Sequence, residues 1–292
     1  MTNSDPRTKY PVPPFPETEF QDQPGLTALV HPTPDHGENS YRGTGQLKGC
    51  KALITGGDSG IGRAVAIAFA REGADVAISY LPAESADAHE VQKLVTDAGV
   101  KCVLLPGDLR EEATCAKVVA QTVEELGGLD TLVLNAATQF SRNEDVDIPL
   151  AEILKVFETN LISPMLLMRE AAPHLQPGST VTVTASIQAY NPSPDLLDYA
   201  MSKSALVAFT QAQAMEQAKR GVRVNAVAPG PIWTPLIPAT DWGDKIQNFG
   251  ADSPFGRPGQ PAEVAPAYVF LASEAASYVS GAVLPVTGGK HL

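Results

Sequence analysis

Three side chains in the second half of the sequence could together move a proton. Tyr199 and Lys203 are four residues apart in a stretch of helical character, so their side chains would share one face of a helix. A lysine ammonium beside a phenol favours the phenolate and would lower the tyrosine pKa from about 10 by roughly 1 to 3. Ser186 lies upstream, directly after a predicted strand. The set predicts an acid–base centre, although Tyr-x-x-x-Lys alone also occurs in ordinary amphipathic helices.

A glycine-rich turn could hold a phosphate. Residues 55–62 read Thr-Gly-Gly-Asp-Ser-Gly-Ile-Gly, between a predicted strand and a predicted helix. Without Cβ atoms, Gly56, Gly60 and Gly62 permit a tight turn and a close approach of a pyrophosphate to the helix N-terminus. A plain glycine-rich connection is the alternative, but the strand–turn–helix context favours a nucleotide site.

A third candidate is the segment Pro229-Gly-Pro-Ile-Trp-Thr234, which immediately follows another predicted strand. Exposed main chain at Pro231 and Ile232, with the Thr234 hydroxyl, could bind a small amide. Taken alone, a simple strand-ending turn explains this segment better.

These residues lie where predicted strands end, within an alternation of strands and helices. Strands separated by helices of this length need crossover connections, so we expect an α/β fold with a doubly wound parallel sheet and helices on both faces. Ligands bind such sheets at the carboxyl ends of the strands. The predicted strands are 51–55, 75–80, 101–105, 130–134, 180–185, 222–227 and 283–286, and the predicted helices are 63–72, 84–98, 111–126, 150–159, 161–172, 198–219 and 262–273.

The composition narrows the class of protein. A chain of 292 residues, 43% of them hydrophobic, suits one large domain or at most two small ones. A net charge of −12 argues against binding to nucleic acid or to anionic lipid. Three cysteines imply no disulfide framework, and no stretch is long and apolar enough to span a membrane. We therefore expect a cytoplasmic protein.

Residues 1–46 differ from the rest of the chain. Eight of the 25 prolines lie before residue 35, and the segment shows no apolar periodicity. Two interpretations stay open: a flexible tail, or an extended arm laid over the domain or a neighbouring subunit. The side chains that could anchor such an arm are Tyr10, Phe15, Phe20, Leu26, Leu29 and Val30. Residues 47–292 would form the catalytic domain, with a lid at about 233–257.

Together the motifs resemble those of the short-chain dehydrogenase/reductase family over roughly residues 47–291. The resemblance rests on Thr55-Gly56…Gly60-Ile61-Gly62, Asp108, Asn135-Ala136, Asn160, Ser186, Tyr199…Lys203 and Pro229-Gly230. Within the family, the chain is similar to bacterial stress-type oxidoreductases with an N-terminal extension. The resemblance implies a single Rossmann-type domain with about seven strands, a bound nicotinamide dinucleotide and a homotetramer.

The resemblance also implies a role for each matching residue. Tyr199 would exchange a proton with a carbonyl or alcohol, and Ser186 would polarise that oxygen. Lys203 would hold the nicotinamide ribose and lower the Tyr199 pKa, and Asn160 would hold a water that links Lys203 to solvent. The implied cofactor-binding residues are Gly56, Asp58, Ser59, Gly60, Ile61, Gly62, Ser79, Tyr80, Asp108, Leu109, Asn135, Ala136, Ala137, Tyr199, Lys203, Pro229, Gly230, Ile232 and Thr234. No metal is expected.

Two positions depart from the family's pattern. The usual Asn-Asn-Ala-Gly is Leu134-Asn-Ala-Ala137 here, so a stiffer or shifted loop over the cofactor is expected. The usual Asp before the C-terminal Gly-Gly is Thr287. Neither change removes a catalytic atom.

The choice between NAD and NADP depends on the residues after the second strand. NAD enzymes place an acidic residue there for the ribose 2′-hydroxyl, and NADP enzymes place a basic residue nearby. Residues 78–82 read Ile-Ser-Tyr-Leu-Pro, with neither. Ser79 could donate to a 2′-phosphate, whereas Asp58 would oppose one if it faces the ribose. We predict NADP or NAD, with a lean toward NADP and with dual use plausible.

The predicted walls of the substrate pocket are Gln139, Gln188, Tyr190 and Trp233. The lid also carries Trp242, Phe249 and Phe255, so an apolar or aromatic carbonyl substrate is expected. Alternatively, these aromatic side chains pack beneath the loop or at a subunit contact. Arg142 or Arg257 would change this expectation if either faced the pocket.

The leading function is that of an NAD(P)-dependent oxidoreductase acting on C=O and CH–OH groups, most simply an aldehyde or ketone reductase. A catalytically silent redox sensor or scaffold is the main alternative, but such proteins usually lose the tyrosine or the lysine. Sugar-nucleotide epimerase or dehydratase chemistry is disfavoured by the short chain after Lys203 and by the glycine spacing. Enoyl reductases have a wider Tyr–Lys spacing.

Overall fold

A single parallel sheet of seven strands forms the centre of the molecule. The computed structural model describes residues 4–16, 20–141 and 148–292. The strand order is β3-β2-β1-β4-β5-β6-β7, and every neighbouring pair is parallel. The strands are β1 (Lys51–Thr55), β2 (Asp75–Tyr80), β3 (Cys102–Pro106), β4 (Thr131–Leu134), β5 (Thr180–Thr184), β6 (Arg223–Pro229) and β7 (Val283–Val286). The predicted Rossmann-type fold is confirmed.

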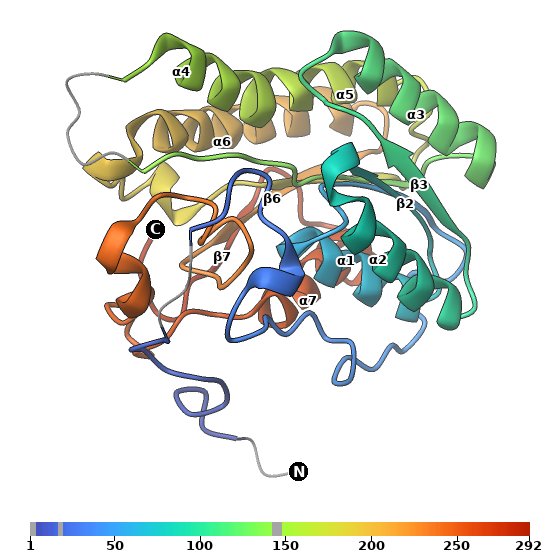
Figure 1. Cartoon of the computed structure of the whole chain (residues 1–292). Helices are drawn as coiled ribbons and strands as arrows, with labels where there is room; N and C mark the ends of the chain where they lie inside the picture. The colour runs from blue at the N-terminus through green and yellow to red at the C-terminus, as the bar shows by residue number, and fades with distance from the viewer. Residues whose placement is uncertain (1–3, 17–19, 142–147) are drawn as a thin grey trace.

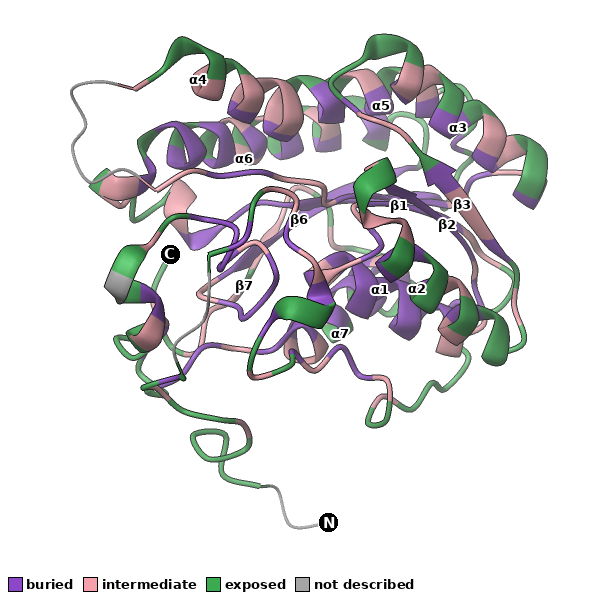
Figure 2. Ribbon diagram, viewed as in Figure 1, coloured by how far each residue is buried: buried purple, intermediate pink, exposed green. Residues whose placement is uncertain are grey.

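Helices cover both faces of the sheet. In Figure 1, α3, α4, α5 and α6 lie above the sheet, and α1, α2 and α7 lie below it. The helices are α1 (Gly60–Arg71), α2 (Ser85–Asp97), α3 (Glu112–Leu126), α4 (Leu150–Phe157), α5 (Ser163–Ala171), α6 (Leu197–Ala218) and α7 (Pro261–Ala272). Figure 2 shows buried strands between helices whose outer surfaces are exposed, the arrangement that an apolar stripe on each helix produces.

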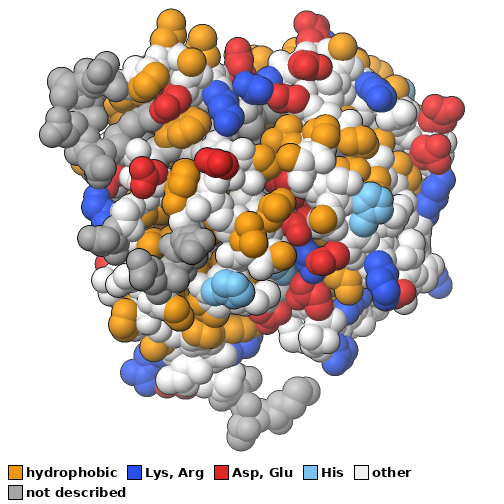
Figure 3. Space-filling model, viewed as in Figure 1, with side chains coloured by type: hydrophobic (Ala, Val, Ile, Leu, Met, Phe, Trp, Pro, Cys, Tyr) orange, Lys and Arg blue, Asp and Glu red, His pale blue; other side chains and the backbone are white. Residues whose placement is uncertain are grey.

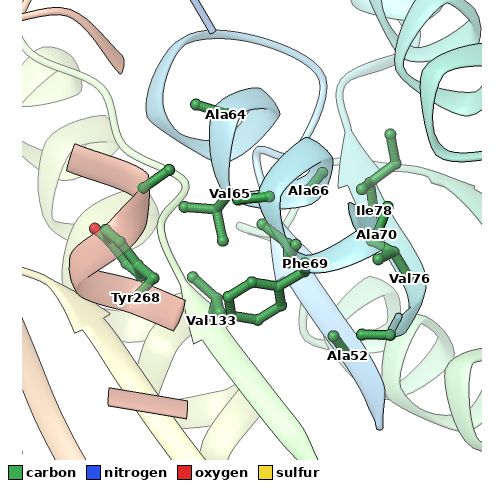
Figure 4. Packing of buried hydrophobic residues seen from close by; sticks show 14 of the residues in the cluster. Ala52, Ala64, Val65, Ala66, Phe69, Ala70, Val76, Ile78, Val133 and Tyr268 are labelled. Atoms are coloured by element: carbon green, nitrogen blue, oxygen red, sulfur yellow. The ribbon is translucent and has the colours of Figure 1, made fainter. Parts of the chain in front are cut away.

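Small side chains let α1 approach the sheet and α7 closely. Most of α1 is buried, including four alanines of its Ala64–Ala70 stretch. Figure 4 shows the Phe69 ring beside Val133 of β4, with Tyr268 approaching from α7. A second cluster fills the other face between the sheet and α3, α5 and α6. The sheet is therefore buried on both sides, as its continuous apolar strands require.

The helical region between β4 and β5 is continuous, although two separate helices were expected. A π-helical turn at Glu158–Ile162 joins α4 to α5 and contains Asn160. Asparagine is a poor residue for a helix interior, and π-helical turns often occur at functional sites. Asn160 is fully buried in this turn.

The N-terminal segment crosses the front of the domain. In Figure 1 it runs beside the segment that follows β6. The Phe15 ring lies 4.6 Å from the Trp233 ring, centre to centre, in an apolar cluster that also contains Val30, Ile237 and Ile246. The Trp233 indole donates to the Pro32 carbonyl at 2.7 Å. The described part of residues 1–46 is thus tied to the 233–257 segment by packing and by hydrogen bonds.

Candidate active site

A cavity of about 740 Å³ lies at the carboxyl edge of the sheet, where the predicted motifs meet. This volume is within the range of small-molecule and cofactor sites. The predicted site residues that line it are Gly56, Asp58, Ser59, Gly60, Ile61, Ser79, Tyr80, Asp108, Leu109, Asn135, Ala136, Ala137, Gln139, Ser186, Gln188, Tyr199, Lys203, Pro229, Gly230, Ile232 and Thr234. The parallel topology brings these strand ends to one edge.

Ser186, Tyr199 and Lys203 lie together in this cavity. Ser186 follows β5, and its hydroxyl accepts a hydrogen bond from the Gln188 amide at 3.1 Å. Tyr199 and Lys203 occupy the first turns of α6, with the Lys203 Nζ 5.4 Å from the Tyr199 ring centre. Lys203 Nζ donates to the Thr184 carbonyl at 2.7 Å, which fixes the long side chain at the end of β5.

Burial dominates the ionisation of this pair. It raises the pKa of Tyr199 to about 12, while a hydrogen bond with Ser186 acts in the opposite direction. It lowers the pKa of Lys203 to about 7. The expected lowering of the Tyr199 pKa by Lys203 is therefore not found. The physical reason is desolvation, which disfavours both the phenolate and the ammonium, and an amine without its proton does not attract a phenolate.

Asn160 lies behind the cavity rather than on its wall. Its Oδ1 accepts from the Thr138 amide at 2.8 Å. Its Nδ2 donates to the Thr138 carbonyl at 2.9 Å and to the Ser202 hydroxyl at 3.1 Å. Asn160 thus joins the loop after β4 to α6 beside Lys203. Its predicted role in holding a water stays a prediction.

A hydrogen-bond network holds the ends of β1, β4 and β5 together. The Asn135 amide Nδ2 donates to the carbonyls of Thr55 and Gly56 at 3.1 and 3.2 Å. The Thr184 hydroxyl donates to Asn135 Oδ1 at 3.1 Å and lies 2.7 Å from the Tyr268 hydroxyl. Sequence reasoning missed Thr184 and Tyr268, because their link depends on α7 packing against the sheet.

The glycines of the turn lie so close to neighbouring atoms that a side chain at these positions would clash. A Cβ on Gly62 would lie 1.8 Å from the Gly56 carbonyl oxygen, and one on Gly60 would lie 3.2 Å from Thr234 Cβ. Gly56 and Gly60 also have φ values of 60° and 51°, a region that favours glycine. Gly62 does not line the cavity; it lets the start of α1 pack closely on Gly56 and Asn135. The turn thus forms a cradle that fits a pyrophosphate at the N-terminus of α1.

Acidic groups gather near the end of β2. Buried Asp58 Oδ2 and Ser79 Oγ have no hydrogen-bond partner among the described residues. Glu84, which sequence reasoning missed, also lines this part of the cavity. Burial raises the pKa of Asp58 well above its usual value, and the Glu84 charge adds to this. Burial likewise raises the pKa of Glu84 to about 7. A ribose hydroxyl could satisfy the orphaned oxygens here.

Two predicted pocket residues, Trp233 and Tyr190, do not line the cavity. Trp233 is fully buried against Phe15, so it anchors the N-terminal segment instead. Tyr190 follows a short helix after Ser186 and is 38% exposed. Both errors arose because the sequence shows which residues neighbour a motif but not which way the loop turns them.

The remaining side chains of the predicted lid divide between the cavity and the interior. Trp242 and Phe249 line the cavity, whereas Phe255 does not. Arg257 is buried away from it, with its guanidinium paired to Glu263 at 2.8 Å. Arg142 lies outside the described residues.

The surface carries mixed charge. On the face drawn in Figure 3, Lys and Arg side chains are scattered among Asp and Glu.

Within the described ranges, no helix has the length and apolar character needed to cross a membrane.

Comparisons with known proteins agree with this geometry. Residues 56–291 match the family model described as "Enoyl-(Acyl carrier protein) reductase". The chain is 49% identical over 270 residues to General stress protein 39 of Bacillus subtilis, covering 92% of this chain and 94% of that protein. It is 44% identical over 275 residues to the chloroplastic NADPH-dependent aldehyde reductase 1 of Arabidopsis thaliana, covering 91% and 95%. It is 42% identical over 280 residues to the glucose and ribitol dehydrogenase of Daucus carota, covering 94% and 96%.

Solved structures show the same fold. A short-chain dehydrogenase from Burkholderia cenocepacia in complex with NADP has a TM-score of 0.78 and 30% identity, covering 84% of this chain and 98% of that one. A 3-ketoacyl-(acyl-carrier-protein) reductase from Brucella melitensis complexed with NADH has a TM-score of 0.77 and 31% identity, covering 84% and 100%. With these relatives and a match over residues 56–291, the chain belongs to the short-chain dehydrogenase/reductase family of oxidoreductases.

Proposed function

We propose that this NAD(P)-dependent oxidoreductase reduces aldehydes or ketones, with Tyr199 as the proton donor. The observation that carries the proposal is the meeting of Ser186, Tyr199 and Lys203 in one cavity with the glycine cradle. The cofactor, when bound, supplies the hydride. Tyr199 supplies the proton, and its pKa of about 12 keeps the phenol protonated at neutral pH. A protonated phenol suits donation to a carbonyl.

Ser186 and Lys203 support Tyr199. The Ser186 hydroxyl accepts from the Gln188 amide and also hydrogen-bonds Tyr199, so it lies beside the phenol where it can polarise a substrate oxygen. Lys203, held by Thr184, is placed to return a proton toward Tyr199, because its pKa of about 7 lets it gain and lose a proton at neutral pH. A positioned acid of this kind contributes about 10²- to 10⁴-fold to the rate.

Both dinucleotides fit the cavity, and the balance between them depends on Asp58 and Glu84. Their carboxylates oppose a 2′-phosphate when ionised, whereas Ser79 could donate to one. A relative named for NADPH, one neighbour bound to NADP and another bound to NADH make dual use the favoured proposal. The two carboxyl groups oppose NADP least at lower pH, where they are neutral.

A polyol is the second candidate substrate, since one relative is a glucose and ribitol dehydrogenase. The cavity favours the carbonyl proposal because Leu196, Ile237, Trp242 and Phe249 give it apolar walls. A panel of aldehydes, ketones, polyols and an enoyl thioester, each assayed with both cofactors, separates these activities.

The deciding experiment is Tyr199→Phe. We expect a loss of about 10²- to 10⁴-fold in kcat on an aldehyde, with the Kd for NADPH and NADH nearly unchanged. Retention of most activity would disprove the proton-donor role. A wild-type chain that bound dinucleotide but turned over no substrate would favour the alternative of a redox sensor or scaffold.

We also propose a homotetramer in the cytoplasm, on the family resemblance. Exposed apolar side chains on α4, α5 and α6, namely Leu150, Leu154, Met165 and Met201, are compatible with subunit contacts. Light scattering of the full chain gives the assembly mass directly.

A further inference from the structure

One polar side chain of the N-terminal segment reaches the cavity. Gln23, Pro24 and Gly25 line it, although every anchor expected in this segment was apolar or aromatic. The proposed chemistry does not use these three residues. Their place on the wall raises the question of what the N-terminal segment does there.

The Gln23 amide uses its full hydrogen-bonding capacity to join three elements. Its Oε1 accepts from the Thr138 hydroxyl at 2.8 Å and from Lys155 Nζ at 3.0 Å. Its Nε2 donates to the Gln139 carbonyl at 2.7 Å and to the Ala239 carbonyl at 3.4 Å. A primary amide has two donors and one oxygen with two lone pairs. One side chain thus connects the loop after β4, helix α4 and the 233–257 segment.

The same contacts lead to the catalytic helix. Thr138 is held through its main chain by Asn160, which donates to Ser202 on α6. Ser202 in turn donates to the Tyr199 carbonyl at 2.7 Å. A second link, from Gln139 Nε2 to the Thr240 hydroxyl at 3.0 Å, also joins the loop to the 233–257 segment.

The chain beside Gln23 packs against Pro235, the residue after Thr234. A Cβ on Gly25 would lie 2.4 Å from the Pro235 carbonyl oxygen, so the two backbones are in direct contact. A Cβ on Gly60 would lie 3.8 Å from Pro235 Cδ. The N-terminal segment therefore lies on the cavity wall between Pro235, which neighbours the glycine turn, and the loop after β4.

We propose that residues 23–25 form a clasp over the bound dinucleotide, with Gln23 as the positioning residue that fastens the 233–257 segment to the loop after β4. Cofactor exchange then requires the clasp to open. This inference rests on the proposed function, because it assumes that the cavity holds a dinucleotide. It predicts a slow cofactor release that depends on a residue outside the catalytic set and the glycine turn.

The test measures release of NADPH, and of NADH in turn, from the full chain by stopped-flow fluorescence. Gln23→Ala removes four hydrogen bonds, so we expect dissociation to be about tenfold faster or more. Gln23→Glu keeps both acceptor contacts and loses both donations, so it should fall between wild type and Gln23→Ala. The neighbouring exposed residue provides the matched control, and Asp22→Ala should release cofactor at the wild-type rate.

A second measurement uses no turnover. Hydrogen–deuterium exchange over residues 20–32 should slow when NADPH is added to wild type, and should slow less in Gln23→Ala. An unchanged dissociation rate and an unchanged exchange pattern in Gln23→Ala would overturn the clasp. If Gln23→Ala does not fold, Gly25→Ala tests the clasp instead. This substitution displaces the segment from Pro235, so it must also speed dissociation of the dinucleotide. A wild type that binds neither dinucleotide would instead disprove the proposed function, and the clasp with it.

Discussion

Two groups of polar side chains at the cavity, one around Asn160 and Lys203 and one around Asp58 and Ser79, differ in whether they have hydrogen-bond partners. At the catalytic end, Asn160 makes three hydrogen bonds and Lys203 donates to the Thr184 carbonyl. At the β2 end, Asp58 Oδ2 and Ser79 Oγ are buried with no partner in the described part of the chain. An unsatisfied buried group costs stability, so it persists where a ligand can satisfy it. Hydrogen bonds within the protein hold the catalytic end, whereas the β2 end leaves polar atoms that a ligand can bind.

The glycine turn lies between the two ends of the cavity. A substitution there should therefore cause the largest loss of stability and of cofactor binding. Gly62→Ala would place a Cβ 1.8 Å from the Gly56 carbonyl oxygen and 2.7 Å from Asn135 Nδ2. Backbone must move, and we expect a loss of about 3 kcal/mol or more in the free energy of unfolding, with loss of cofactor binding. Urea unfolding and NADPH titration measure both.

Gly107→Ala is the matched control for this substitution. The three atoms nearest to a Cβ there all belong to the Thr114 side chain, the first at 2.5 Å, and a side chain can rotate. Equal unfolding midpoints for Gly62→Ala and wild type would contradict the close packing of the turn.

Removing a satisfied group at the catalytic end should destabilise the protein. Asn160→Ala leaves the buried Thr138 amide and carbonyl without their side-chain partner. We expect about 2 to 3 kcal/mol less stability and a lower kcat, since the loop and α6 lose their link. Asn39 is exposed, and Asn39→Ala should change neither quantity. A neutral Asn160→Ala would mean that this end is not held as described.

At the β2 end, the choice of cofactor should depend on pH. Burial raises the pKa of Glu84 to about 7, so between pH 6 and pH 8 its carboxyl gains negative charge beside the proposed ribose site. We expect NADPH affinity relative to NADH to fall by up to about tenfold over this range, because like charges repel. Fluorescence titrations with both cofactors at each pH give the ratio.

Glu84→Gln should flatten this pH dependence, and Glu124→Gln, at an exposed position on α3, should not. If the wild-type ratio does not change between pH 6 and pH 8, Glu84 does not face the ribose of the cofactor.

Replacing the buried Asp58 carboxyl, whose Oδ2 has no partner in the described part of the chain, should stabilise the protein, whereas Asn160→Ala should destabilise it. The pKa of Asp58 is raised in the folded state, so the unfolded chain releases this proton at lower pH and stability falls as pH rises toward the folded pKa. Asp58→Asn should therefore be more stable at pH 8 by about 1 kcal/mol, or roughly 2–4 °C in Tm.

The gain for Asp58→Asn should shrink at about pH 3, below the ordinary carboxyl pKa of 3.8, because the carboxyl is then largely protonated in both states. Asp22 lies exposed on the N-terminal segment, and Asp22→Asn should leave Tm unchanged at both values. A lower Tm for Asp58→Asn at pH 8 would show that the carboxylate stabilises the fold without a ligand.

The sequence by itself determined the sheet and the position of the catalytic set along it. Apolar runs such as Thr131–Leu134 are buried on both faces, and helices of ten or more residues between strands force parallel crossovers. Because parallel strands end at one edge, Ser186, Tyr199 and Lys203 had to meet the glycine turn. Local pattern and topology were sufficient for these features.

Only the tertiary structure decided what surrounds that set. Gln23 meets Thr138 across 115 positions of sequence, and Glu84 enters the cavity beside Asp58 through the turn before α2. Trp233 faces the N-terminal segment rather than the substrate because Phe15 offers it an apolar partner. Such contacts depend on how irregular segments fold back on the domain. The hydrophobic periodicity of the sequence does not predict this. The ionisation of Tyr199 and Lys203 likewise follows from burial, which only packing in three dimensions determines.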